Sequence, residues 1–173
     1  IRIGDRDDNG AVHEVVVDGS LLARDGAGGS IYSRYGSLIT VNAGAVLETG
    51  AALSLGGSMN VSGTVNARTN VVLGAKTENS DADWSGRSAV LNLNPGAQMS
   101  VAGNFEVGFS DDVVRKGVVN VDNATLTVEG TLYVGRDSTQ DGYKNGVAEV
   151  SASNSSYVAA GNISVNAGSS LSI

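Results

Sequence analysis

One phrase recurs along this chain: an apolar residue, a Gly, a polar loop, a second Gly or Asn-Gly, and then an alternating apolar and polar run. The copies begin at Ile3-Gly4, Leu73-Gly74, Val107-Gly108 and Val134-Gly135. Self-similarity at a period of a few tens of residues indicates a solenoid, in which each repeat stacks on its neighbours. This repeat constrains the fold more strongly than any other feature of the sequence.

Short runs of strictly alternating apolar and polar residues fill the intervals between the loops. Examples are Leu38-Ile39-Thr40-Val41, Leu91-Asn92-Leu93, Val119-Asn120-Val121 and Leu126-Thr127-Val128. This alternation predicts strands with one buried and one wet face. No window has the apolar spacing of a capped amphipathic helix, so we expect almost no helix. The intervals are also too short for helical crossovers, so parallel strands would be joined by coiling of the chain itself.

Aligning the repeats on Gly103, Gly130 and Gly161 predicts which residues stack. The predicted apolar columns are Phe105/Leu132/Ile163, Val107/Val134/Val165, Met99/Leu126/Tyr157, Val101/Val128/Ala159 and Leu93/Val121/Val150. The predicted outward columns are Asn92/Asn120/Glu149 and Ser100/Thr127/Val158. We therefore predict an all-β fold, a right-handed parallel β-helix with three short strands per coil and roughly six coils.

The longer polar loops all leave the repeat directly after the apolar-Gly step. They cover residues 5–10, 75–86, 109–117 and 136–146. Because equivalent loops of stacked coils project from the same side, we expect a rod with one decorated edge and plainer faces elsewhere. Residues 1–173 would form a single β-solenoid segment, and because the chain ends mid-pattern we expect it to be a fragment of a longer domain.

Composition narrows the classes of partner. The chain has 11 Lys and Arg against 18 Asp and Glu, a net charge of −7, which repels phosphate backbones and anionic headgroups. We therefore expect no nucleic-acid partner. No apolar run approaches the roughly 18 residues that span a bilayer, so we expect no membrane insertion of this segment. With no Cys, the chain has neither a disulfide framework nor a thiolate metal site, and we expect no cofactor.

Residues 98–108 and 126–135 each predict a pair of strands joined at a Gly and ending in Val-Gly. These two stretches resemble the β-helical passenger region of Gram-negative autotransporters and its short associated repeat. The resemblance covers most of the chain. It implies a passenger domain that is exported through an outer-membrane barrel and displayed at the bacterial cell surface or released outside the cell.

A weak metal candidate lies near the N-terminus. Asp5, Asp7 and Asn9 precede Gly10 with the spacing that opens a calcium loop. The twelfth position from Asp5 is Val16, where an EF-hand needs a bidentate Glu. We therefore favour an acidic, solvated turn over a calcium site and expect no metal.

The residue pattern gives little support for a catalytic site. His13 is the only His, and we place it on a solvent-facing strand position equivalent to Glu149 or Asn120. Polysaccharide-cutting β-helices need clustered carboxylates with a basic residue on one face. The best candidates are Asp111-Asp112 with Arg115-Lys116, and Asp81 and Asp83 beside Trp84. Loop solubility is the better account of these charges, since adjacent strand carboxylates point in opposite directions.

The loops supply the binding candidates. They contain the aromatic residues Trp84, Phe109 and Tyr143 and the carboxylates Asp111, Asp112, Asp137 and Asp141. We predict a non-catalytic surface stalk or adhesin segment whose partner is a host-cell surface protein or glycan. Self-association between rods is a further possibility. The alternative is a polysaccharide-acting β-helix enzyme or a phage-fibre-like glycan-binding domain.

Overall fold

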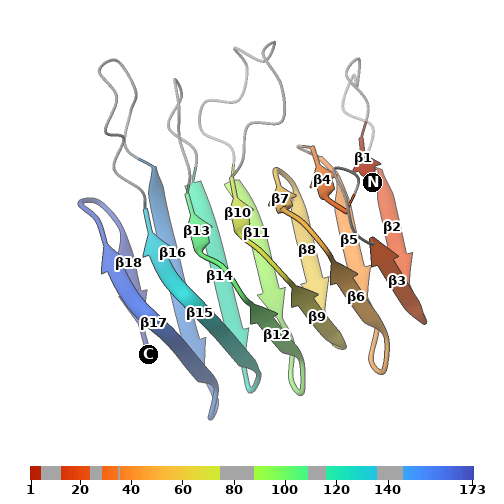
Figure 1. The fold of residues 1–173 in the computed structure, drawn as a ribbon. Helices are drawn as coiled ribbons and strands as arrows, with labels where there is room; N and C mark the ends of the chain where they lie inside the picture. Colours follow the sequence, from red (N-terminus) through yellow and green to blue (C-terminus); the bar gives the residue numbers. More distant parts are fainter. Residues whose placement is uncertain (5–12, 24–28, 35, 75–87, 109–115, 136–145) are drawn as a thin grey trace.

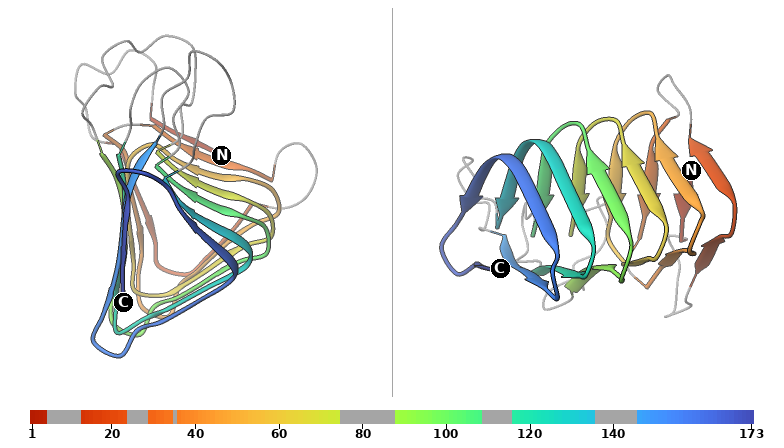
Figure 2. Two further views of the ribbon diagram at one scale, coloured as in Figure 1. Left: turned by 90° about the vertical axis from the view of Figure 1, so that its left-hand side faces the viewer. Right: turned by 90° about the horizontal axis from the view of Figure 1, so that it is seen from below.

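The computed structural model describes residues 1–4, 13–23, 29–34, 36–74, 88–108, 116–135 and 146–173, which contain 18 strands and no helix. All paired strands are parallel, and the chain winds through them as a right-handed coil (Figures 1 and 2). Seen along its axis the rod is triangular, with three faces and three corners (Figure 2). The predicted parallel β-helix is confirmed.

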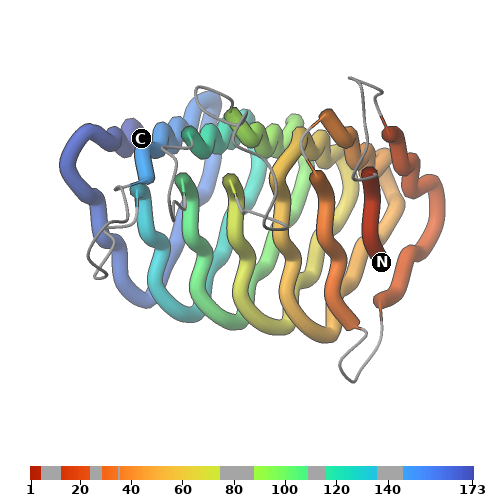
Figure 3. The backbone as a smooth tube through the Cα atoms, turned by 90° about the horizontal axis from the view of Figure 1, so that it is seen from above, coloured from red at the N-terminus to blue at the C-terminus, as the bar shows by residue number. Residues whose placement is uncertain are grey.

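Each coil contributes one strand to each face. Face 1 consists of β2 (Glu14–Val17), β5 (Leu38–Val41), β8 (Ser58–Val61), β11 (Ser88–Leu93), β14 (Lys116–Asp122), β16 (Val147–Ser153) and β18 (Ser170–Ser172). Face 2 consists of β3 (Ser20–Ala23), β6 (Val46–Thr49), β9 (Thr64–Ala67), β12 (Gln98–Val101) and the first parts of β15 (Thr125–Val134) and β17 (Tyr157–Val165). Face 3 consists of β1 (Arg2–Ile3), β4 (Ile31–Ser33), β7 (Leu53–Leu55), β10 (Val71–Leu73), β13 (Phe105–Val107) and the second parts of β15 and β17. Six coils begin at β2, β5, β8, β11, β14 and β16, as Figure 3 traces.

Apolar columns fill the interior. Phe105 pairs with Leu132, and Val107 with Val134, and all four side chains are fully buried. The same columns continue to Ile163 and Val165, which face the open end of the last coil and are each 47% exposed. Both columns match the alignment on the corner glycines. Burial of about 25 cal/mol per Å² of apolar surface is the main term that stabilises such a stack.

One prediction fails by a single residue. Tyr157 and Ala159 were expected in the buried columns, but Val158 pairs with Leu126 and Ala160 with Val128. The register shifts between Val128 and Thr131, where β15 carries one residue more than β17. A one-residue shift turns every side chain to the opposite face of the sheet. Tyr157 therefore points outward and is 61% exposed.

A second correction concerns a slip of two residues on face 1. Val150 pairs with Val119, and Ala152 takes the predicted place of Val150 beside Val121. Such a slip preserves the alternation of inward and outward residues, so periodicity cannot detect it. Two outward columns change with these registers. Asn120 is followed by Ser151 and not Glu149, and Thr127 is followed by Ala159 and not Val158.

Asparagine side chains organise the corner between faces 2 and 3. The Oδ1 atom of Asn70 accepts the backbone N–H of Asn104 at 2.9 Å, and Oδ1 of Asn104 accepts that of Thr131 at 2.9 Å. A Cβ on Gly103 would lie 2.2 Å from the Asn70 oxygen, and one on Gly130 would lie 2.5 Å from the Asn104 oxygen. Glycine is therefore required here because the amide of the preceding coil occupies that space.

The packing of the interior leads to a first prediction. Val134→Asp places a carboxylate in a fully buried column and should lower the free energy of unfolding by roughly 3–5 kcal/mol. Val118→Asp is the matched control, because Val118 faces outward on β14, and it should cost about 1 kcal/mol. Urea unfolding measures both. An equal loss in the two variants would contradict the register.

A second prediction uses a polar group inside the core. Thr49 is fully buried at the end of β6, and its Oγ1 has no hydrogen-bond partner among the described residues. Thr49→Val keeps the shape and removes the unsatisfied hydroxyl, so it should raise the unfolding free energy by about 1–2 kcal/mol. Thr40→Val, on the outward side of β5, should change it by less than about 0.5 kcal/mol. Destabilisation by Thr49→Val would show that this hydroxyl is satisfied in solution.

Candidate functional site

The corner between faces 3 and 1, called the loop corner below, is where the chain leaves the rod at matching points of successive coils. Leu73, Val107 and Val134 end their strands in one register. The next strands resume in a second register, in which Ser88 pairs with Lys116, and Lys116 with Val147. The segments 75–87, 109–115 and 136–145 connect these points. Their predicted departure from a common edge is confirmed by the residues on either side (Figure 1).

The apolar-Gly step has a physical cause at this corner. Gly74, Gly108 and Gly135 have φ angles of 89°, 74° and 70°, in the left-handed region that disfavours side chains. A Cβ on Gly108 would also lie 2.2 Å from the carbonyl oxygen of Val147, at the start of β16. These three coils thus turn out of face 3 through the same backbone conformation.

The same corner can be closed without a long segment. Between β7 and β8 only Gly56 and Gly57 intervene. Between β17 and β18 a tight turn suffices, in which the backbone N–H of Ser169 donates to the carbonyl of Asn166 at 3.0 Å. The longer segments of the other coils are therefore additions to the coil and not requirements of its closure.

The predicted binding residues belong to those longer segments. Trp84, Phe109, Tyr143, Asp111, Asp112, Asp137 and Asp141 lie outside the described residues, as do Asp5, Asp7 and Asn9 of the calcium candidate and Asp81 and Asp83. Their binding roles stay predictions. The structure describes the strand ends on either side of the segments that contain them.

His13 does not occupy the predicted strand position. It lies directly before β2 and is half-buried, and its carbonyl accepts the backbone N–H of Leu38 at 2.8 Å. Glu14, not His13, begins the strand and pairs with Leu38. The strand starts one residue later than the alternation suggested, so His13 belongs to the loop corner and not to the outward face.

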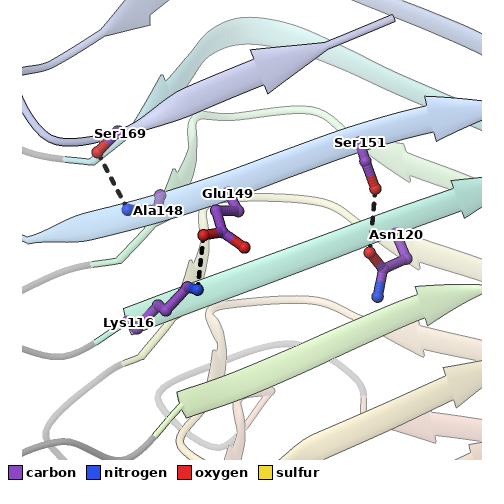
Figure 4. A network of polar contacts seen from close by, with 6 residues as sticks. All are labelled: Lys116, Asn120, Ala148, Glu149, Ser151 and Ser169. Atoms are coloured by element: carbon purple, nitrogen blue, oxygen red, sulfur yellow. Dashed lines mark hydrogen bonds and ion pairs between the residues drawn. The ribbon is translucent and has the colours of Figure 1, made fainter.

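Face 1 carries a ladder of hydrogen-bonded polar side chains that was not predicted from the sequence. Asn92 Nδ2 donates to Asn60 Oδ1 at 2.9 Å, and Asn120 Nδ2 donates to Asn92 Oδ1 at 2.8 Å. Ser151 Oγ then donates to Asn120 Oδ1 at 3.0 Å (Figure 4). The signal was present, because the three Asn residues occupy the same place in three alternating runs.

An ion pair and a corner contact lie beside this ladder. Lys116 Nζ lies 2.6 Å from Glu149 Oε1 on the neighbouring strand (Figure 4). Both side chains are substantially exposed, so the pair contributes at most about 1 kcal/mol. Ser169 Oγ accepts the backbone N–H of Ala148 at 3.0 Å and ties the last turn to β16. These contacts stabilise neighbouring coils and do not assemble catalytic groups.

Within the described ranges, no group of three or more His, Cys, Asp or Glu side chains could hold a metal ion. The same ranges contain no helix that is long and apolar enough to cross a bilayer. Comparison with known proteins finds no match to this chain among family models, curated proteins or solved structures.

The loop corner generates a third prediction. Deleting residues 77–83 should leave the β-helix folded, because the equivalent corner after β7 closes with two glycines and closure entropy depends only logarithmically on loop length. Far-ultraviolet circular dichroism and the melting temperature measure the outcome. As a control, deleting residues 94–97 removes the whole turn between β11 and β12 and should abolish the transition. Loss of the β signal in the 77–83 deletion would show that this segment stabilises the coils.

Proposed function

We propose that this chain is a non-catalytic segment of a β-helical stalk or adhesin that presents loops for adhesion or self-association. The observation that supports the proposal is the common register at the loop corner. Three consecutive coils release long segments after Leu73, Val107 and Val134, at points about 4.8 Å apart along the axis. A rigid rod with loops along one edge can hold several weak contacts on one partner at once.

The residue types in these segments suggest the partner. Trp84, Phe109 and Tyr143 offer aromatic faces for sugar rings or apolar side chains, and such residues often dominate binding energy. Carboxylates accompany them at Asp111, Asp112, Asp137 and Asp141. These accept hydrogen bonds from sugar hydroxyls or pair with a basic protein surface. The proposed partner is therefore a host-cell surface protein or glycan.

The proposed location is the bacterial cell surface or the extracellular space, reached by export through the outer membrane. This part rests on the resemblance of residues 98–108 and 126–135 to autotransporter passenger repeats. A rod of stacked coils suits display, because its length grows with coil number while each coil contacts only its neighbours.

Self-association is a second candidate because the part of face 1 formed by β5, β8 and β11 carries no charge. The outward residues of β5, β8 and β11 are Leu38, Thr40, Ser58, Asn60, Ser88, Val90 and Asn92, none of which is charged. On a chain with net charge −7, such a face can approach a second copy without opposing carboxylates. An amide in the ladder keeps hydrogen-bonding capacity that its ladder contacts do not use. Light scattering against protein and salt concentration separates this candidate from binding to another molecule.

The enzymatic alternative would need carboxylates from neighbouring coils along one groove. One outward column at the centre of face 1 contains amides and hydroxyls instead, including Asn60, Asn92 and Asn120, and the other is mostly apolar. We therefore favour the non-catalytic proposal. A reducing-sugar assay on pectin-like and host glycans tests the alternative directly.

The fourth prediction tests the loop corner as the adhesive edge. Trp84→Ala and, separately, Tyr143→Ala should weaken binding to host cells or immobilised host glycans by roughly tenfold each, since a buried aromatic anchor contributes at least about 1–2 kcal/mol. Tyr32→Ala is the matched control, because Tyr32 is 39% exposed on face 3. Binding is measured by surface plasmon resonance, alongside the melting temperature.

Two results would contradict this assignment. Unchanged binding in both loop variants would place the adhesive surface elsewhere on the rod. A lower melting temperature with binding retained would show that the two aromatic residues stiffen their own coils and do not contact a partner.

A further inference from the structure

Face 2 carries an uncharged array of hydrogen-bonding side chains on three consecutive coils. Its members, called the face-2 strip, are Thr64 and Asn66 on β9, Gln98 and Ser100 on β12, and Thr125 and Thr127 on β15. The register places Thr64, Gln98 and Thr125 in one column, and the other three in a second column. All six side chains face outward. The strip lies on the side of the triangle opposite the loop corner (Figure 2).

An exposed aromatic residue extends the first column. Tyr157 pairs with Thr125 and is 61% exposed. Its outward position results from the register shift near Gly130, which turns it away from the core. The strip therefore places two columns of polar side chains beside one accessible phenol ring. This is the combination that sugars need, because they present hydroxyl groups at their edges and C–H groups on their faces.

The spacing of the strip favours an extended ligand. Successive coils repeat at about 4.8 Å, and outward residues on one strand lie roughly 6.6 Å apart. One coil step is comparable with the length of one sugar residue in a straight chain. Thr, Ser, Asn and Gln can each both donate and accept hydrogen bonds, as sugar hydroxyls require. Ser100 Oγ also lies 2.9 Å from Asn66 Oδ1 and holds that amide in place.

The charges around the strip exclude an anionic ligand. The strip itself has no charged residue, and the nearby Arg68 is occupied by Glu48, with Nη2 and Oε1 2.5 Å apart. The chain as a whole carries a net charge of −7. A polyanion would therefore meet repulsion without a free cation from these residues. A neutral polymer is not repelled by the negative charge of the chain and needs no cation to bind.

We propose that the face-2 strip binds a neutral, extended β-1,4-linked polysaccharide that lies along the rod axis with one ring stacked on Tyr157. The hydroxyl and amide groups of the two columns contact successive sugar residues, one per coil. This site goes beyond the proposed function, because adhesion at the loop corner uses other residues on another side of the rod. A second site on the opposite face would let one rod lie along a glycan while its loops contact a different partner.

The test is a titration of the 173-residue chain with cellohexaose and with chitohexaose, followed by calorimetry and by chemical-shift changes. We expect binding of at least one of these straight, neutral hexasaccharides. Maltohexaose, whose α-1,4 links curve the chain, and an anionic oligogalacturonate should bind at least about tenfold more weakly.

Variants locate the site. Tyr157→Ala should weaken binding by roughly tenfold and Tyr157→Phe by much less, since the ring supplies the contact. Tyr32→Ala on face 3, at another exposed tyrosine, should leave hexasaccharide binding unchanged. The melting temperatures should match in Tyr157→Ala, Tyr157→Phe and Tyr32→Ala, because both tyrosines are exposed and these substitutions spare the buried columns.

Three outcomes would overturn the proposal: no binding of either straight hexasaccharide at millimolar concentration, equal binding of maltohexaose, or unchanged binding in Tyr157→Ala. Loss of binding in Trp84→Ala with Tyr157→Ala unaffected would move glycan recognition to the loop corner. That result would support the adhesive edge while rejecting the strip, so failures of the two proposals are distinguishable.

Discussion

Parallel hydrogen bonding between coils is the constraint on which everything else in this rod depends. Each coil must return to the same register as the one before it, or its apolar residues would point outward. Leu55, Leu73, Val107 and Val134 remain in one fully buried column because their three intervening registers agree. The corners absorb the differences in length between coils. The loop corner closes with two glycines after β7, and it carries added segments after the left-handed Gly74, Gly108 and Gly135. The fold therefore tolerates variable loops but very little variation within a strand.

This constraint explains which parts of the fold could be read from the sequence. Alternation and the corner glycines correctly predicted the class of fold and the three strands per coil. They also predicted the columns close to those glycines, such as Phe105 with Leu132. The predicted columns were wrong where one strand has an extra residue and where the register between two strands differs by two residues. The register shift near Gly130 moved Tyr157 to the surface, and the slip at Val150 left alternation intact. Both depend on local backbone geometry that a pattern of residue types does not encode.

The candidate sites were predictable to a different degree. The departure points of the loops followed from Gly74, Gly108 and Gly135, whose conformation the coil requires. The loop side chains obey no periodicity, so their arrangement could not follow from the repeat. The face 1 ladder shows the converse case. Asn60, Asn92 and Asn120 are ordinary outward residues one at a time, and only the register reveals that they are hydrogen-bonded to one another across coils.

A rod built in this way separates stability from recognition more completely than a globular domain does. Inward columns carry the hydrophobic stabilisation, and outward positions on the same strands can change with little effect on it. A partner of a face would therefore contact a whole column and not one residue, because the parallel register places an equivalent outward side chain at each coil. A face built of amides and hydroxyls, such as that around Asn92 or Thr125, suits partners that are themselves periodic, whereas the loop corner suits partners that are not. The two proposals therefore assign two independent modes of binding to the loops and the faces of a single scaffold.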